Sequence, residues 1–201
     1  MLRILNIPQL FWVLLAIPAA AMIAGFVGDP VTAFDLVHSS GEFSIRLMII
    51  AMMISPLRAI VGRRLWLDWL LARRRAIGVA AFGYGLLHLL FYLYDMGEWG
   101  QIWEEVAIFS IWTGYLALLI LAAMASTSNN RAQRALKRNW KRLQQLVYPA
   151  ALLVALHWLY VDGELQAMAV HFVPLLILET ARIVLMFKRR SARNAKQALT
   201  G

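Results

Sequence analysis

Two histidines stand inside apolar, helix-forming stretches of the chain: His88 in GYGLLHLLFYLY and His157 in PAALLVALHWLY. A buried imidazole is costly in lipid unless it is hydrogen-bonded or bound to something. His88 lies 13 residues after Arg75, and His157 lies 15 residues after Arg142, so both are expected at a similar depth. Two imidazoles at one depth on different helices are typical of a metal centre held between helices.

The composition predicts that these helices lie in a membrane. Of the 201 residues, 61% are hydrophobic, which is more than an ordinary soluble domain carries. Cysteine is absent, and this excludes thiolate-ligated haem, iron–sulfur clusters and disulfides. The net charge of +9 is concentrated between the apolar runs, which favours contact with a lipid bilayer and argues against binding of nucleic acid. The sequence contains neither G-x-G-x-x-G nor a P-loop, so it predicts no nucleotide-binding fold.

Six apolar stretches are long enough, or nearly so, to cross a bilayer as helices of about 20 residues. They lie near residues 9–27, 43–61, 77–95, 106–125, 144–161 and 169–187. We therefore expect an all-α integral membrane bundle of six helices, with one transmembrane domain over residues 1–190 and a cytosolic tail over 191–201. The first stretch could be a signal peptide, but a single flanking Arg3 and its continuation to Val27 favour a retained helix.

The charges between the apolar stretches alternate in sign along the chain. The second and fourth connections and the tail are basic, and the first, third and fifth connections are acidic. The basic residues are Arg58, Arg63, Arg64, Arg73, Arg74, Arg75, Arg131, Arg134, Lys137, Arg138, Lys141, Arg142, Lys188, Arg189, Arg190, Arg193 and Lys196. The acidic residues are Asp29, Asp35, Glu42, Asp95, Glu98, Glu104, Glu105, Asp162 and Glu164. Because basic loops stay in the cytoplasm, both termini are expected there. These loops could also dock an acidic soluble electron donor.

The third and fifth stretches then run in the same direction, and both histidines lie about 20 Å from the inner surface. A haem with two axial histidines needs neutral imidazoles on facing helices and small residues where the ring meets the backbone. Gly85, one turn before His88, supplies such a surface. We predict a b-type haem with His88 and His157 as axial ligands, an arrangement suited to electron transfer. For each histidine alone, an interhelical hydrogen bond or an interfacial position is the alternative.

Other polar residues near the same depth have weaker assignments. His171, at the start of the sixth stretch, could ligate, contact a haem propionate or lie in the interface, and the last two are favoured. Arg46 can extend outward to the interface or neutralise a propionate. His38 is expected at the surface or as a helix cap, and Glu179 and Arg182, spaced i, i+3, are expected to pair with each other.

Several segments, in matching order from about residue 28 to 187, resemble the MsrQ family, also called YedZ. They are GDPVTAFDLVHSSGEFSIRL, ISPLR at 54–58, RRRAIG at 73–78, LLHLLFY around His88, and NWKRLQQLVY leading to ALHWLY. The family provides the haem-binding membrane subunit of a bacterial periplasmic methionine-sulfoxide reductase system. It belongs to the ferric-reductase-like transmembrane superfamily.

The resemblance implies a multi-pass protein of the bacterial inner membrane that transfers electrons without being the catalytic subunit. The donor would be a cytosolic flavin reductase or a membrane quinol, and the acceptor a periplasmic molybdopterin-containing reductase. On this basis His88 and His157 match the family's principal haem-ligating histidines, and FMN is a further associated cofactor. A stand-alone ferric or quinone reductase of the same fold is one alternative. A non-redox membrane scaffold or transporter is another.

One departure from the family's superfamily pattern affects the expected number of haems. Ferric-reductase-type helices usually carry a second histidine about thirteen residues toward the cytoplasm. Here Arg75 and Gln144 stand at those positions. One haem in the outer half is therefore expected, rather than an inner and an outer haem.

Overall fold

The computed structural model describes residues 8–28 and 31–200, and every regular element in this part of the chain is an α-helix. Arg3, the flank of the first stretch, and Asp29, in the first acidic connection, lie outside the described residues. The helices are α1 (Pro8–Gly28), α2 (Ala33–Val61), α3 (Leu65–Met96), α4 (Trp99–Glu105), α5 (Phe109–Ser126), α6 (Asn130–Leu136), α7 (Arg138–Gln144), α8 (Val147–Asp162) and α9 (Leu165–Thr200).

Within the described residues, six segments are long and apolar enough to cross a membrane, which confirms the predicted number of spans. They correspond to α1, α2, α3, α5, α7 with α8, and α9. Three of these helices are longer than the apolar stretches that predicted them, because helical structure continues through polar flanking residues. Thus α2 and α3 begin well before residues 43 and 77, and α9 continues through the expected tail to Thr200.

The early start of α2 has a local cause. Thr32 and Asp35 form a capping box, in which the Asp35 backbone N–H donates to the Thr32 hydroxyl at 3.3 Å. The Asp35 carboxylate in turn accepts from the Thr32 backbone N–H. Such a reciprocal pair satisfies backbone donors at a helix start. It brings the polar segment around Gly41 into the helix, where this segment forms part of the site.

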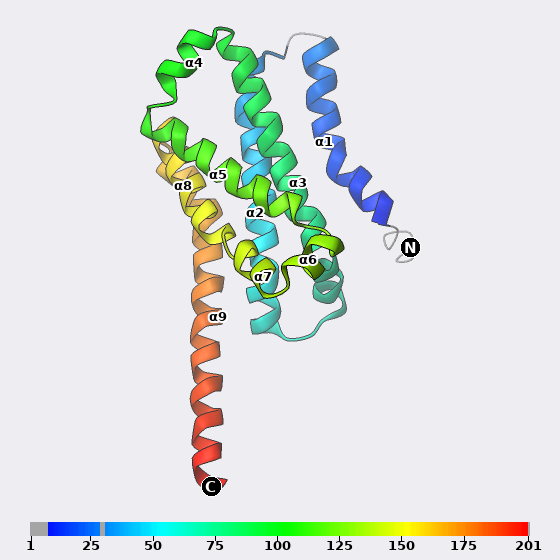
Figure 1. Cartoon of the computed structure of the whole chain (residues 1–201), viewed down its shortest axis with the longest axis vertical. Coiled ribbons are helices and arrows are strands. Elements are labelled where there is room, and N and C mark those ends of the chain that lie inside the picture. Colours follow the sequence, from blue (N-terminus) through cyan, green and yellow to red (C-terminus); the bar gives the residue numbers. More distant parts are fainter. Residues whose placement is uncertain (1–7, 29–30, 201) are drawn as a thin grey trace.

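The connections between the spans gather at two ends of the bundle. Figure 1 shows α4 and the turn between α8 and α9 toward one end, with α6, α7 and the loop from α2 to α3 toward the other. The second end carries the basic connections, and the final turns of α9 extend beyond it. The predicted alternation of charge along the sequence therefore becomes a separation of charge between the two ends.

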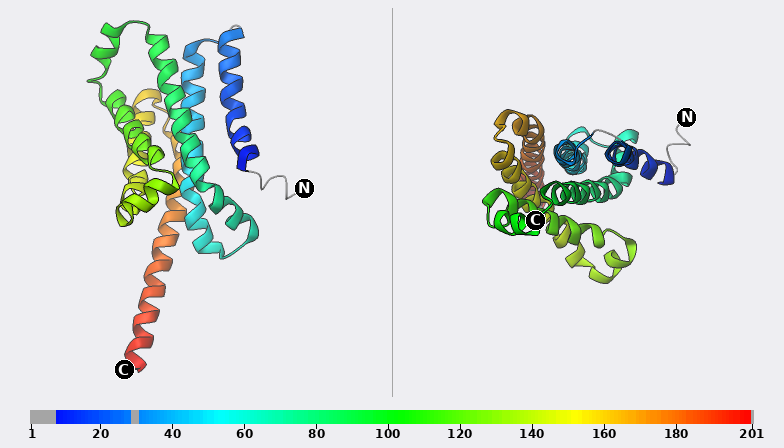
Figure 2. Two further views of the ribbon diagram at one scale, coloured as in Figure 1. Left: turned by 45° about the vertical axis from the view of Figure 1, so that its right-hand side comes forward. Right: turned by 90° about the horizontal axis from the view of Figure 1, so that it is seen from above.

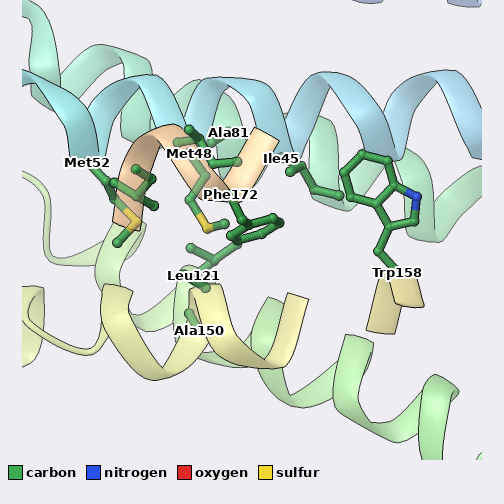
Figure 3. Close-up of a cluster of buried hydrophobic side chains, with 11 residues drawn as sticks. Ile45, Met48, Met52, Ala81, Leu121, Ala150, Trp158 and Phe172 are labelled. Carbon is green, nitrogen blue, oxygen red and sulfur yellow. The ribbon is translucent and has the colours of Figure 1, made fainter. Parts of the chain in front are cut away.

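The core lies where α2, α3, α5, α8 and α9 meet. Figure 3 shows this cluster, in which Ala81 and Ala150 allow close helix approach and methionines fill the remaining space. Its buried members are Ile45, Met48, Ile49, Met52, Ala81, Leu121, Ala150, Ala151, Trp158, Phe172 and Leu175. Leu121 lines a cavity on each side of this core, so the core separates the two cavities.

The first span lies at the edge of the bundle, beside α2 and α3 (Figure 2). Pro18 interrupts its hydrogen-bond ladder, because proline crowds the preceding turn and lacks an N–H. The Tyr84 hydroxyl of α3 bridges the disturbed turn by donating to the Leu15 carbonyl at 2.8 Å and accepting from the Ala19 N–H at 2.9 Å. A backbone break that would be costly in lipid is thereby satisfied by a side chain.

Candidate cofactor site

The structure brings His88 of α3 and His157 of α8 together, as the sequence predicts. Their ring centres are 6.1 Å apart and their planes are nearly perpendicular, at 86°. Both rings line a cavity of about 380 Å³ between α2, α3, α5 and α8, on the α4 side of the core. The remaining wall is mostly apolar, with Tyr92 and Tyr115 among the polar exceptions. The cavity is therefore mostly apolar and carries two imidazoles in its wall.

Each imidazole is fixed by a backbone carbonyl of the neighbouring helix. His88 Nδ1 lies 2.8 Å from the Val37 carbonyl oxygen, and His157 Nδ1 lies 2.6 Å from the Ser110 carbonyl oxygen. A carbonyl oxygen only accepts, so these contacts assign the proton of each ring to Nδ1. With the proton on Nδ1, a neutral imidazole offers the Nε2 lone pair to a ligand. Ligating histidines commonly have this arrangement, in which the second nitrogen donates to a carbonyl.

The separation of the rings suits a shared metal atom. A metal–imidazole bond is about 2 Å long and each ring centre lies about 1 Å behind Nε2, so two axial imidazoles have centres about 6 Å apart. The measured 6.1 Å agrees with that spacing. Two neutral axial nitrogens in an apolar cavity are the donor set that a six-coordinate haem requires. The residues present therefore fit a haem.

Two glycines allow the rings to reach these carbonyls. A Cβ atom on Gly41 of α2 would lie 2.9 Å from His88 Nδ1, and one on Gly114 of α5 would lie 2.7 Å from His157 Nδ1. Both separations are shorter than the distances that real Cβ atoms keep from other heavy atoms. The sequence predicts Gly85 as the small residue at the site, whereas Gly41 and Gly114 were not predicted. Gly85 does line the cavity, but its own close neighbours are Ser44 and Leu118.

Arg46 and His171 are not among the described residues that line this cavity. Arg46 Nε donates to His171 Nε2 at 3.3 Å, and His171 Nδ1 donates to the Ala167 carbonyl at 2.8 Å. Arg46 also pairs with Glu42. Both nitrogens of His171 are thus engaged, unlike those of the facing pair. A contact between either residue and a haem propionate stays a prediction.

His38 lies at the mouth of the cavity. Its side chain is 60% exposed, and its Nδ1 lies 3.6 Å from a carboxylate oxygen of Asp162 at the end of α8. Both residues line the cavity together with Glu42. The polar mouth therefore opens at the α4 end of the bundle, and the paired histidines lie deeper.

A second cavity, of about 1100 Å³, lies on the other side of the core toward α6 and α7. Its wall includes Arg75 and Gln144, which stand where ferric-reductase-type helices usually carry a second histidine. Arg75 donates to Asn130 and Gln133 of α6 at 2.8 and 3.0 Å, and Gln144 Nε2 donates to the Met124 carbonyl at 3.1 Å. Six cationic side chains line this cavity: Arg74, Arg75, Lys137, Arg138, Lys141 and Arg182.

The predicted pairing of Glu179 with Arg182 on α9 is confirmed. Arg182 Nη2 lies 2.8 Å from a Glu179 carboxylate oxygen and donates to the Tyr148 hydroxyl at 2.9 Å. The Tyr148 hydroxyl donates to Glu179 at 3.3 Å, so the three residues tie α8 to α9. Arg182 Nε is buried without a hydrogen-bond partner beside the second cavity.

Comparison with known proteins agrees with this architecture. Residues 40–155 match the family of the ferric reductase like transmembrane component. A protein of Xanthomonas campestris pv. campestris (strain 8004) is 38% identical over 169 residues, covering 82% of this chain and 73% of the relative. A protein of Rhodospirillum rubrum is 34% identical over 182 residues, covering 88% and 85%. No solved structure is detectably similar.

The fold and the match over residues 40–155 define the class: a ferric-reductase-like multi-pass membrane protein. The Xanthomonas and Rhodospirillum relatives are both named as the haem-binding subunit MsrQ of a protein-methionine-sulfoxide reductase. At this identity and coverage, the chain belongs to the MsrQ family.

Proposed function

We propose that the chain is a haem b-binding subunit of the bacterial inner membrane that transfers electrons to a methionine-sulfoxide reductase. The observation that carries this proposal is the facing pair of His88 and His157, with Nδ1 of each ring bound to a carbonyl and Nε2 of each ring left for iron. Haem supplies a one-electron redox centre when bound between them. The chain has no cysteine to attach haem covalently, which favours the b type.

The orientation of the bundle gives the proposed transfer a direction. Basic connections remain in the cytoplasm, so we place α6, α7 and both termini on that side. The histidine cavity then lies in the periplasmic half and opens toward α4. One haem between His88 and His157 would therefore be close to a periplasmic acceptor. We assign that role to a molybdopterin-containing subunit, which would reduce a sulfoxide to a thioether and water with two electrons and two protons.

The second cavity supports a cytoplasmic entry point for electrons. Its cationic wall and the unpartnered Arg182 Nε suit an anionic group, such as the phosphate of FMN. We propose that FMN binds here, or that a quinol or a cytosolic flavin reductase delivers electrons at this face. Release of FMN from the denatured purified protein, at a fixed ratio to the chain, would support the flavin assignment. A flavin-free preparation that accepts electrons from quinol would exclude it.

The proposed function is tested by reconstitution. We expect detergent-purified protein to show the sharp reduced bands of low-spin b haem. Membranes containing it, supplied with a quinol or with a reduced flavin reductase as electron donor, should reduce a methionine-sulfoxide peptide only when the secreted reductase is added. The variants His88→Ala and His157→Ala should lose both the bands and the electron delivery, because each removes one axial ligand.

The matched control is His38→Ala, which removes an exposed histidine at the mouth of the same cavity. This variant should keep the haem bands. A colourless wild-type preparation, or haem kept at full occupancy in both His88→Ala and His157→Ala, would contradict the proposal. If the wild-type protein reduced ferric salts at the same rate with and without the secreted reductase, it would instead be a stand-alone ferric reductase.

A further inference from the structure

We infer that Gly41 and Gly114 are positioning residues for the two histidines, because each exposes the backbone carbonyl that orients one ring. The inference rests on the proposed haem site. Its evidence is a pair of matching contacts in two separate helix pairs, α2 with α3 and α5 with α8.

The mechanism follows from helix geometry. In an α-helix each Cβ is tilted toward the N-terminus, so the side chain at one position covers the carbonyl four residues earlier. Gly41 follows the Val37 carbonyl by that spacing, and Gly114 follows the Ser110 carbonyl by the same spacing. Without a Cβ, each carbonyl can accept a bond from a neighbouring helix in addition to its helical bond and to the hydroxyl bond from Ser40 or Thr113 on its own helix. His88 and His157 occupy these two openings.

The contact is specific to the rings. The three atoms that a Cβ on Gly41 would meet all belong to His88, and those for Gly114 all belong to His157. Gly78 and Gly83 of α3, by contrast, would place a Cβ in open space. Since the atoms met belong to side chains, alanine at position 41 or 114 would push the ring from its carbonyl while the helices stay packed.

Displacing the ring has consequences that simple packing loss does not have. The Nδ1–H···O=C bond fixes the tautomer and the ring plane and makes the imidazole a stronger donor. Its loss should weaken metal binding by about 10–100-fold. The ferric state would be less stabilised, so the reduction potential should rise.

The ring planes provide a spectroscopic readout. The two ring planes are 86° apart. If the rings keep this angle when they bind one low-spin ferric iron, they would give a strongly anisotropic signal in electron paramagnetic resonance. A ring released from its carbonyl is free to turn about its metal bond. The anisotropic signal should therefore change in Gly41→Ala and in Gly114→Ala.

The test compares three purified holoproteins: Gly41→Ala, Gly114→Ala and the control Gly83→Ala. We expect the first two to bind haem at least ten-fold more weakly, with a raised potential and an altered resonance signal, and the control to match wild type. Wild-type affinity, potential and signal in both site variants, with haem still lost in His88→Ala, would overturn the inference and leave the proposed function standing.

A second measurement needs no haem and covers the case in which none is bound. Thermal unfolding of the full chain from haem-starved cells is followed for Gly41→Ala with His88 present and with His88→Ala. The glycine substitution should lower the unfolding temperature when the ring is present and raise it when the ring is absent, because alanine favours a helix over glycine. The same change of sign should link Gly114 to His157 but not to His88. An equal effect in both backgrounds would overturn the inference.

Discussion

The two halves of the bundle use the same kind of bond between helices, from a side-chain nitrogen to a helical carbonyl, but with different side chains. In the α4 half, His88 and His157 donate to the carbonyls of Val37 and Ser110. In the α6–α7 half, the accepting carbonyls are about four helical turns further along α2 and α5. There, Ala51 accepts from Arg74 Nε at 2.8 Å, and Met124 accepts from Gln144 at 3.1 Å.

The residues that follow these carbonyls also differ. In the α4 half, the residue four positions on is glycine, at Gly41 and Gly114. In the α6–α7 half it is serine: Ser55 accepts from Arg74 Nη1 at 3.0 Å, and Ser128 donates back to the Met124 carbonyl at 2.7 Å. The accepting carbonyls therefore recur at the same spacing along α2 and α5, and the type of side chain that bonds to them decides what each half of the bundle can do. A planar ring with a free nitrogen can serve as the proposed ligand, whereas the cation of Arg74 and the amide of Gln144 connect the helices through hydrogen bonds.

The largest expected effect is on haem content, which should depend on the α4 half of the bundle and not on the α6–α7 half. His88→Ala should retain less than about a tenth of the wild-type haem, since loss of a ligand's partner alone costs about 10–100-fold in metal affinity. Gln144→Ala should retain all of it, because Gln144 lies by the second cavity. The haem-to-protein ratio measured by pyridine haemochrome absorbance checks both. Haem loss in Gln144→Ala would show that the second half also ligates.

A smaller effect is expected in stability from the α6–α7 half. Arg74→Met removes two hydrogen bonds from a charged donor, and the loss of either one should lower the free energy of unfolding by about 1.5–3 kcal/mol. Chemical unfolding in detergent would measure this loss, and haem content should stay unchanged. Arg64→Met, an exposed arginine at the same end, serves as the control and should unfold like wild type. Equal stability of the two variants would show that Arg74 does not brace α2.

The smallest effect on stability should come from the uncharged hydrogen bond of the Gln144 amide. Gln144→Ala removes one amide contact between helices, and such contacts in membrane proteins contribute about 0.6–1.7 kcal/mol. The neighbouring Gln145→Ala, whose side chain is exposed, is the matched control. The same unfolding measurement should rank the variants Arg74→Met, Gln144→Ala and Gln145→Ala in decreasing order of loss. A reversed order would contradict the distinction between charged and neutral braces.

The sequence was sufficient to predict the spans and the histidine pair, because hydropathy and the spacing of His88 and His157 from the basic clusters are local properties. The start of α2 was predicted too late, at residue 43, although Thr32 and Asp35 have the spacing of a capping box. The Val37 and Ser110 carbonyls were not predictable. Their role depends on how α3 and α8 are rotated against α2 and α5, and a glycine within a helix does not by itself report its neighbour.

The order of the helices along the chain has a consequence for biosynthesis. Val37 precedes His88 and Ser110 precedes His157, so each ring meets its carbonyl on a helix that has already been made. Residues 62–64 join α2 to α3 directly, and the first half of the site can close while α5 is still in the ribosome. On the proposed ligation by His88 and His157, a haem iron would be held from both sides only after residue 157 has entered the membrane. On that ligation, haem would be acquired late in maturation, after the polypeptide has been inserted, and haem supply would be a point at which assembly is limited.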